Sequence, residues 1–360
     1  MKNLNTTFGR PADSQRFIVQ ELRSQIVSGK LAPGSRLPTR LEIKRSFSAG
    51  ATTVQRALEL LRQEGFVQSK GIQGTFVAEN PPHLARYAVV FLAASEEFIR
   101  NRFSTALDSE VRYLRHRRPD LRIAEYYGVD GHEDAEDYQR LVRDIRAHRI
   151  AGLIFTSNPY PVKGTPLLDE PTMPRVVLMF PHEQCKVPTI NLDMDSFFVR
   201  ALDDLQARGR KRIAFLNPTG ICDWQEKLLS MLAERGLETR PFWWQCIWPE
   251  RPEAARFATH LLMRCDERPD ALIISNDNLL EHAAAGLVAA GTRVPDELAV
   301  IAHCNFPYPT PSVLPVRRLG FDARGVLESC IQSIGSQRSG DKVPDVTHIP
   351  AIFEEELTSR

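Results

Sequence analysis

Residues 37–77 read LPTRLEIKRSFSAGATTVQRALELLRQEGFVQSKGIQGTFV, a pattern that predicts two short helices followed by a β-hairpin wing. The first helix has its expected buried side at Leu41, Ile43 and Phe47. Gly65 ends the second helix, whose apolar residues follow helical spacing: Val54, Ala57, Leu58 and Leu61. Residues 66–69 and 75–77 predict two short strands, and the glycines between them allow the positive φ of a tight hairpin. Such a helix pair with a wing commonly places one helix in the major groove of DNA.

Length and charge predict more than this one domain. A chain of 360 residues suggests two or three domains, and 42% hydrophobic with 25% charged residues is typical of a soluble globular protein. Residues 1–80 carry 12 Lys or Arg and 6 Asp or Glu, a surplus of +6. Because the whole chain carries +1, the remainder carries −5. The basic N-terminal part is therefore the part expected to meet a polyanion.

Several classes of protein are disfavoured. The sequence has no run of about 18 uncharged apolar residues, as a membrane span needs, and its N-terminus lacks the apolar core of a secretory signal. Its six cysteines are scattered without a Cys-x-x-Cys pair, which fits reduced thiols better than disulfides or zinc. It also lacks a Gly-x-Gly-x-x-Gly motif after a strand, a phosphate-binding loop, a Gly-x-Ser-x-Gly elbow and a His-Glu-x-x-His motif. We expect a cytoplasmic protein that is not an enzyme and uses no cofactor or metal.

Two segments flank the helix pair and its wing. Residues 13–28 predict a first helix that begins at an N-cap, Asp13 or Ser14, and ends at Gly29. Pro81 and Pro82 predict a stiff, extended linker at residues 80–85, because proline continues neither a helix nor a strand ladder.

The rest of the chain predicts an α/β fold. From residue 86 onward apolar strands alternate with amphipathic helices, which indicates parallel sheets with helices on both faces. The strands divide near residues 191–196 and rejoin near 317–321, so two doubly wound lobes with a cleft between them are expected. The predicted domains are a winged helix-turn-helix at residues 1–79, the linker at 80–85 and a two-lobed domain at 86–360.

The N-terminal stretch resembles the winged helix-turn-helix of the GntR superfamily of bacterial transcription regulators. The residues that carry the resemblance are Gly29, Leu31, Pro33, Gly34, Leu37, Pro38, Thr52, Thr53, Val54, Ala57, Leu58, Gly65 and the run 74–77. The resemblance covers about a fifth of the chain and implies a DNA-binding domain of the winged helix-turn-helix type.

Most of the remaining chain resembles the effector domain of LacI-type repressors, which is itself similar to periplasmic binding proteins. The matching runs are residues 150–154, 209–214, 268–272, 275–277 and 294–301, together with Gly291. A head and body of these two types occur together in arabinose-repressor-like regulators. The resemblance implies that residues 86–360 bind an effector and form a homodimer.

The GntR resemblance places the first turn of the second helix of the pair, residues 51–56, in the major groove. Thr52 and Thr53 can bond phosphates, Gln55 can bond adenine through two hydrogen bonds, and Arg56 can bond guanine or a phosphate. Further candidates are backbone contacts from Arg40, Lys44 and Arg45, and minor-groove contacts from Lys70 and Gln73 at the wing tip. The family often has arginine at 41, 51 and 55, so two usual contacts are missing here. The alternative is that these charges are only a solvated helix surface.

Effector candidates follow from the rule that ligands bind beyond the carboxyl ends of parallel strands. Asn276 and Asp277 follow the predicted strand 271–275, and the matching pair in LacI-type proteins bonds sugar hydroxyls. His303, Cys304 and Asn305 follow the predicted strand 298–302. Trp224 stands where the family usually has a ligand-gripping arginine, and Cys304 where it often has an aspartate, so both of these contacts are absent. Three further positions complete the set, with packing, hinge or helix-capping roles as alternatives: Trp248, Asp193 and Asp195.

These observations predict a sequence-specific DNA-binding transcription regulator, a repressor, that acts as a homodimer on a palindromic DNA operator. A sugar or related small metabolite would bind between the two lobes and change the affinity for DNA. The alternative is an α/β enzyme that acts on a small metabolite and carries a vestigial head.

Overall fold

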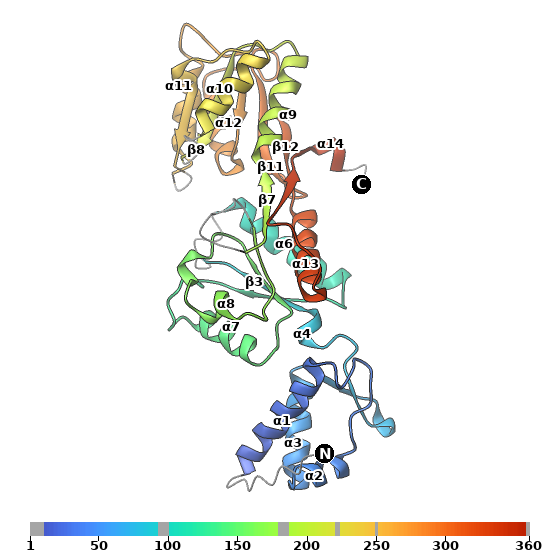
Figure 1. Cartoon of the computed structure of the whole chain (residues 1–360). Coiled ribbons are helices and arrows are strands. Elements are labelled where there is room, and N and C mark those ends of the chain that lie inside the picture. The colour runs from blue at the N-terminus through green and yellow to red at the C-terminus, as the bar shows by residue number, and fades with distance from the viewer. Residues whose placement is uncertain (1–10, 93–100, 179–186, 220–223, 249–250, 358–360) are drawn as a thin grey trace. The chain divides into compact units, whose positions relative to one another are not determined.

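The computed structural model describes residues 11–92, 101–178, 187–219, 224–248 and 251–357 (Figure 1). The chain divides into two compact units. The first comprises Met1–Phe91, Leu114–Phe155 and Pro161–Arg175, and the second comprises Leu92–Tyr113, Thr156–Tyr160 and Val176–Arg360. No helix among the described residues is long and apolar enough to cross a membrane.

The first unit begins with three helices and a two-stranded hairpin, drawn in blue in Figure 1. These elements are α1 (Pro11–Val27), α2 (Arg40–Ser46), α3 (Ala51–Gln63), β1 (Val67–Ser69) and β2 (Thr75–Val77). The strands pair antiparallel, with Val67 opposite Val77. One apolar cluster joins all five elements, and its most buried members are Ile18, Ile26, Ile43, Val54, Ala57, Leu61, Phe66 and Val77. The winged helix-turn-helix predicted from residues 37–77 is confirmed.

Local residue chemistry explains where these elements start and stop. Thr39 and Glu42 form a capping box at the start of α2: the Thr39 hydroxyl accepts from the Glu42 N–H, and the Glu42 carboxylate accepts from the Thr39 N–H at 2.7 Å. Gly65 after α3 has a φ of +81°, a left-handed value that glycine adopts without strain. Gly74 in the hairpin has a φ of +110° and lies against the Arg36 guanidinium, which leaves little room for a Cβ.

Three local expectations in this region are wrong. The side chain of Leu41 is 55% exposed, because on the short helix α2 it points away from the core that Ile43 enters. Helix α1 begins at Pro11, ahead of both predicted N-caps. The linker is not extended, because Pro82 occupies the first position of a short helix, α4 (Pro82–Ala85), where its missing N–H costs nothing.

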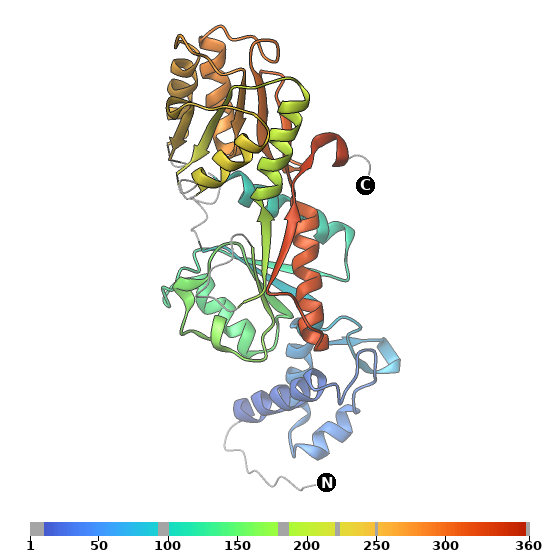
Figure 2. The same cartoon turned by 45° about the horizontal axis from the view of Figure 1, so that its top comes forward.

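The first of the two large sheets has the strand order β13-β7-β6-β5-β3-β4. The strands are β3 (Arg86–Val90), β4 (Arg122–Tyr126), β5 (Gly152–Phe155), β6 (Arg175–Leu178), β7 (Thr189–Asp193) and β13 (Val346–Pro350). Strands β7 and β13, adjacent and parallel, are plain in Figure 2. The helices of this region are α6 (Arg102–Arg117), α7 (Glu136–Arg146), α8 (Pro166–Asp169) and α13 (Ala323–Ser339).

The second large sheet lies wholly in the second unit and has the order β14-β12-β11-β10-β8-β9. Its strands are β8 (Ile213–Pro218), β9 (Trp244–Ile247), β10 (Ala271–Ile274), β11 (Ala299–Phe306), β12 (Arg317–Asp322) and β14 (Ile352–Phe353). All pair in parallel except β14, which pairs antiparallel with β12. The helices are α9 (Met194–Ala207), α10 (Gln225–Glu234), α11 (Ala254–Leu262), α12 (Leu280–Ala289) and α14 (Glu354–Leu357).

Alternate residues of the central strands face opposite layers of helix. Ala214 and Leu216 belong to the core that α11 and α12 complete. Phe215, between them, faces the other way and meets Phe198 of α9, with ring centroids 6.3 Å apart. Helices therefore cover both faces of the sheet, and the predicted fold class, a winged helix-turn-helix followed by doubly wound parallel α/β sheets, is confirmed.

Two strand boundaries differ from the prediction. Strand β11 continues to Phe306, so His303, Cys304 and Asn305 lie within it and not after it. Its polar residues stay in the sheet because β12 pairs alongside them, with Asn305 opposite Phe321. Strand β9 starts at Trp244 and not near Pro241, where the sequence pattern predicts it, because Pro241–Trp243 forms a 3-10 turn.

Candidate nucleic-acid interface and ligand site

The first turn of α3 presents polar side chains to solvent. Thr52, Gln55 and Arg56 are exposed and Thr53 is partly exposed. Val54 and Ala57, which alternate with them around the helix, are buried in the core. A surface helix with one side locked in a core and the other polar is the geometry needed to insert into a major groove.

The start of α3 also suits an anionic partner. Gly50 is the N-cap residue and supplies no side-chain hydrogen bond to the first N–H groups of the helix. Unsatisfied N–H groups and the positive end of the helix dipole both favour an anion such as a phosphate at that position. Ala51 and Thr52 are exposed beside them.

Helix α2 supplies a second group of cations. Arg40, Lys44 and Arg45 are all exposed, and the part of the chain that the structure describes gives none of them an ion pair. Leu41 is exposed in the same helix, at one of the positions where the resembling family often has arginine. Cationic contacts from α2 must therefore come from Arg40, Lys44 and Arg45.

A hollow of about 280 Å³ lies between α3 and the wing. It is lined by Arg40, Gln55, Leu58, Glu59, Arg62, Val67, Ser69 and Thr75. Glu59 and Arg62 form a two-bond ion pair there, at 3.0 and 2.6 Å. The hydrogen bond from Arg62 lowers the pKa of Glu59, so its carboxylate stays charged at neutral pH. By contrast, the Gln55 and Arg40 side chains in the same lining make no hydrogen bond or ion pair with the described residues and can bind a nucleic acid.

The wing tip is a glycine-flanked turn that carries one cation. Lys70 lies over the Phe76 ring at 4.8 Å and reaches Glu79 only at 3.9 Å. Gln73 is exposed in the same turn, which the Lys70 N–H to Gly74 carbonyl bond of 2.9 Å closes. The predicted wing-tip residues thus lie together, on the same hairpin that lines the hollow beside α3.

A separate polar cluster lies at the carboxyl ends of β10 and β11 in the second unit. Asp277 is 3% exposed and accepts a hydrogen bond of 2.8 Å from Asn305 Nδ2. Its other oxygen lies 3.7 Å from Nδ1 of His303. His303 is held between Phe197 and Phe321, with both ring centroids 5.7 Å away. Of the effector-binding residues predicted from the sequence, the structure brings Asp277 and Asn305 into direct contact.

Two polar atoms of this cluster are buried and lack a partner in the part of the chain that the structure describes. Nδ1 of His303 and Oδ1 of Asn305 make no hydrogen bond to the described residues. Buried polar groups in native proteins nearly always have a partner, protein or otherwise. The cluster can therefore accept hydrogen bonds from, or donate them to, a small polar molecule.

Asn276, Asp193 and Trp224 have structural roles next to this cluster. Asn276 Oδ1 accepts from the Asn278 N–H at 2.9 Å, which caps the turn η5 (Asp277–Leu279). Asp193 likewise caps α9 through the Ser196 N–H at 3.1 Å. The Trp224 ring lies 5.9 Å from that of Phe198. Trp248 follows β9 and is 66% exposed, free of the core.

Cys304 is not a polar group of this cluster. It packs with Phe306 and Ile352 in a small apolar group beside β14. Burial is the largest cause that raises the pKa of its thiol to about 12, and the negative charge of Asp277 is the second. The cysteine is therefore a neutral packing residue where the resembling family often has a carboxylate.

Sequence reasoning missed two members of the neighbourhood and a second hollow. Ser275 donates to Asn217 Oδ1 at 2.7 Å, and both side chains are buried; a polar residue ending each of two adjacent apolar strands was the available signal.

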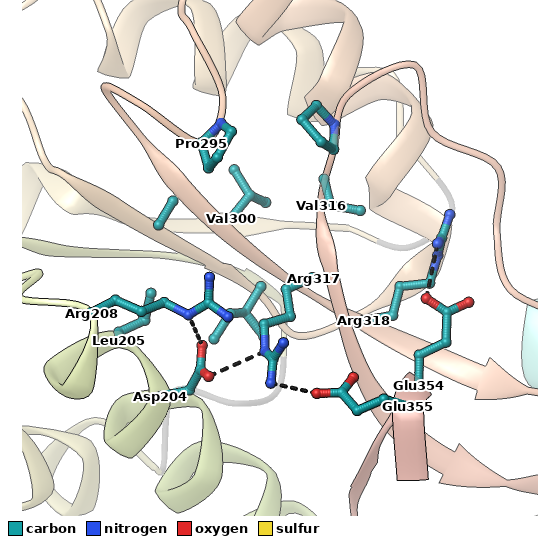
Figure 3. A pocket seen from close by; sticks show the side chains of 13 residues that line it. Asp204, Leu205, Arg208, Pro295, Val300, Val316, Arg317, Arg318, Glu354 and Glu355 are labelled. Atoms are coloured by element: carbon teal, nitrogen blue, oxygen red, sulfur yellow. Dashed lines mark hydrogen bonds and ion pairs between the residues drawn. The ribbon is translucent and has the colours of Figure 1, made fainter. Parts of the chain in front are cut away.

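The second hollow, of about 320 Å³, lies at the amino ends of β11 and β12 (Figure 3). Its arginines are already paired with carboxylates, Arg317 with Asp204 and Glu355, and Arg318 with Glu354. No group of three or more metal-binding side chains occurs among the described residues.

Comparison with family models finds two matches. Residues 14–77 match the gntR family of bacterial regulatory proteins. Residues 202–347 match a periplasmic binding protein-like domain. The two matches fall on the head and on the second sheet, where the two clusters of candidate residues lie.

Characterised relatives are regulators. An arabinose metabolism transcriptional repressor of Geobacillus stearothermophilus is 23% identical over 93% of this chain and 94% of its own. An HTH-type transcriptional regulator of Mycobacterium tuberculosis is 31% identical over 28% of this chain and 84% of its own. Both are regulators and not enzymes, in agreement with the expectation from the sequence.

Solved structures support the same fold. A LacI family transcriptional regulator from Arthrobacter sp. FB24, in complex with lactose, has a TM-score of 0.57 and 19% identity, covering 75% of this chain and 97% of its own. Another from Lactobacillus casei, with bound glucose, has a TM-score of 0.54 and 17% identity, covering 75% and 98%.

Proposed function

The chain belongs to the gntR family of bacterial regulatory proteins and is a DNA-binding transcription regulator, and on this premise we propose that it is a repressor controlled by a small polyhydroxylated molecule. Residues 1–79 bind the operator, and residues 86–360 bind the effector and dimerise. Residues 80–85 link these two domains. The protein acts in the cytoplasm, where its DNA target lies.

The observation that carries the DNA-binding part is the exposed polar turn at the start of α3. Gln55 supplies base contacts, Thr52 and Thr53 supply phosphate contacts, and Arg56 supplies either kind. Arg40, Lys44 and Arg45 neutralise the backbone from α2, and Lys70 and Gln73 approach the minor groove from the wing. The exposure of these side chains, with their neighbours locked in the core, supports this assignment.

The operator is proposed to be a palindrome bound by a homodimer. One winged helix buries too little DNA surface for tight specific binding. Two copies related by a two-fold axis present two identical helices, and the matching DNA site then has two-fold symmetry.

The effector is proposed to bind at the carboxyl ends of β10 and β11, next to Asp277 and Asn305. A buried carboxylate beside a carboxamide can hold a pair of sugar hydroxyls, and the unpartnered atoms of His303 and Asn305 support a polar ligand there. Asn276, Trp224, Trp248 and Asp193 border the site. Relatives named for arabinose metabolism, and similar folds with lactose or glucose bound, favour a carbohydrate.

The test is a DNA-binding titration of the full-length protein on the region upstream of its own gene, at several salt concentrations. Nanomolar to tens of nanomolar affinity is expected, falling steeply with salt because bound cations release counterions from DNA. Failure to bind that region, or binding insensitive to salt, rejects the proposal. Adding single sugars from a panel to the same titration identifies the effector by a shift in affinity.

A further inference from the structure

A chain of ion pairs within the first unit starts at the residue that follows α3. The side chain of Glu64 is only 10% exposed, and its carboxylate binds two arginines from different parts of the chain. Arg23 of α1 donates to Oε2, and Arg149 donates from Nη1 to Oε1 at 3.2 Å. Arg149 follows Glu64 by 85 residues, just after α7. One carboxylate therefore ties the end of α3 to a segment of the body.

Arg149 extends the ion pairs to the first large sheet. Its second terminal nitrogen, Nη2, lies 2.6 Å from Oδ1 of Asp144, a buried residue of α7. The other oxygen of Asp144 accepts from Arg86 Nη2 at 3.1 Å and from the Tyr126 hydroxyl at 2.5 Å. Burial, and next the bond to Asp144, raises the pKa of Tyr126, so its hydroxyl remains a donor at neutral pH. Arg86 and Tyr126 belong to β3 and β4, so α3 is connected to two strands of that sheet.

The backbone before Arg149 holds this arginine in place. The Arg149 N–H donates to the Asp144 carbonyl at 2.8 Å. His148 has a φ of +52°, a left-handed value that is uncommon for a residue with a side chain. Such conformations persist where the surrounding structure requires them. The turn after α7 therefore directs Arg149 to lie between the two carboxylates.

The two residues after Glu64 also contact the body and the linker. Gly65 lies so close to β4 that an added Cβ would come within 2.5 Å of Arg122 Nη1. Phe66 is fully buried, and its ring stacks on His83 of α4 with centroids 6.0 Å apart. The end of α3 is thus fixed on more than one side.

We propose that Glu64 and Arg149 are positioning residues, whose ion pair makes α3 move as one body with the first sheet. The 13 residues of α3 span about 20 Å. One end is held at Glu64, and the other carries the exposed turn assigned to DNA. The effector-binding domain then sets the direction in which that turn meets DNA. The inference rests on the proposed function and adds the contact that joins its two activities.

The first test measures the distance between two spin labels in the full-length protein by pulsed electron paramagnetic resonance. The labels are non-natural amino acids at Ser28, after α1, and at Arg143 on α7, both exposed positions. Wild type should give one narrow distance distribution. Arg149→Met removes the charge and keeps the apolar stem, and it should widen the distribution roughly twofold or more, because the linker then carries more of the connection. Circular dichroism establishes that each protein is folded.

Two further variants at the end of α7 make this test specific. Arg149→Lys keeps the charge but reaches one carboxylate at a time, so its distribution should lie between those of wild type and Arg149→Met. Arg146→Met is the matched control, because Arg146 is exposed at the end of the same helix and makes no ion pair with the described residues. It should give the wild-type distribution.

The second test compares the natural operator with one lengthened by two base pairs between its half-sites. The insertion rotates one half-site relative to the other by about 70°. Wild type should lose about tenfold or more in affinity, whereas Arg149→Met should lose at most about threefold, because heads released from the body can follow the rotation. A residue that only stabilised the fold would change both operators alike. Glu64→Gln weakens the same ion pair from the other side and should relax the spacing in the same way.

These measurements separate failure of the link from failure of the proposed function. A distribution that stays as narrow as wild type in both Arg149→Met and Glu64→Gln overturns the inference. So does a folded Arg149→Met protein that loses as much affinity as wild type on the lengthened operator. The distances are measured without DNA, so widening in both variants supports the link even in a protein that does not bind its upstream region. A broad wild-type distribution in a protein that binds that region removes the link and leaves the regulator.

Discussion

Asn305 donates a 2.8 Å hydrogen bond from Nδ2 to Oδ2 of Asp277, and both side chains are buried. The bond joins the end of β11 to the turn that follows β10. It fixes the carboxylate while leaving Asn305 Oδ1 and His303 Nδ1 without protein partners among the described residues. The polar groups at this end of the sheet are thus positioned in advance and still able to bind.

Asp277→Asn should abolish most effector binding with little change in shape. A hydrogen bond to a charged group contributes more than one to a neutral group, so the affinity for the effector sugar should fall roughly tenfold or more. Calorimetric titration with the sugar found in the DNA-binding assay measures it. Asp296→Asn, an exposed aspartate before β11, is the control and should bind as wild type. Unchanged affinity in Asp277→Asn means that the ligand binds elsewhere, and operator binding without effector should persist in both variants.

Thr39→Ala should loosen α2 by removing one half of its capping box. Loss of an N-cap costs about 1 kcal/mol, so the amides of α2 should exchange with deuterium roughly fivefold faster. Hydrogen exchange read by mass spectrometry measures this directly. Thr172→Ala is the comparison, because the Thr172 hydroxyl bonds only a nearby glutamate on the surface. Equal exchange of α2 in wild type and Thr39→Ala would show that the cap is unimportant there.

The cysteines should differ sharply in reactivity with iodoacetamide. Burial raises the pKa of Cys304 to about 12 and also raises that of Cys330. Because the pKa of Cys304 is raised in the folded protein, its neutral thiol stabilises the folded state. This contribution is complete below the unfolded-state pKa of about 9 and is lost as pH rises through about 12. At pH 8 exposed Cys246 should be alkylated while Cys304 and Cys330 remain intact until the protein unfolds. Peptide mass spectrometry shows which cysteines are alkylated. Early alkylation of Cys304 would contradict its burial in the structure.

Arg317→Ala should weaken the attachment of the C-terminal segment. The Arg317 guanidinium bonds Glu355 at 2.6 Å and lies 3.2 Å from Asp204 (Figure 3). It also covers the Phe353 ring, 4.2 Å from the ring centroid. These contacts are partly exposed, so a loss of about 1 kcal/mol is expected. Urea unfolding measures it, with Arg251→Ala as the control because Arg251 has only a distant partner. A loss no larger than the control's would mean that the segment is held by packing alone.

Most of the head could be predicted from the sequence, because glycines follow α1 and α3 and its core residues follow a short-range period. Leu41 was assigned to the wrong side of α2, since a seven-residue helix gives too few turns for the pattern to define its buried side. The alternation of strands and helices in the body was also predicted, but β7, β12, β13 and β14 were not. Strand β13 was missed because its residues are half exposed and its partner, β7, lies more than 150 residues earlier.

The ligand cluster was predicted only in part. Asn276 and Asp277 end an apolar strand and so were visible in the sequence. The extension of β11 through His303 and Asn305 was not, because polar residues within a strand are stabilised by neighbours that the sequence does not identify. Pairing with β12 and the bond to Asp277 keep these residues in the sheet. Tertiary contacts, and not the local sequence pattern, therefore determine how far β11 extends.

The central claim is that the exposed turn of α3 contacts bases, and Gln55→Ala tests it most directly. Fluorescence anisotropy should compare wild type, Gln55→Ala and the control Gln63→Ala, an exposed glutamine at the far end of the same helix, on upstream DNA and on unrelated DNA. Because a base contact through two hydrogen bonds contributes about 1–3 kcal/mol, Gln55→Ala should lose roughly 5- to 150-fold on the upstream DNA alone. Gln63→Ala should match wild type on both. Equal affinities of all three proteins for the upstream DNA would contradict the claim.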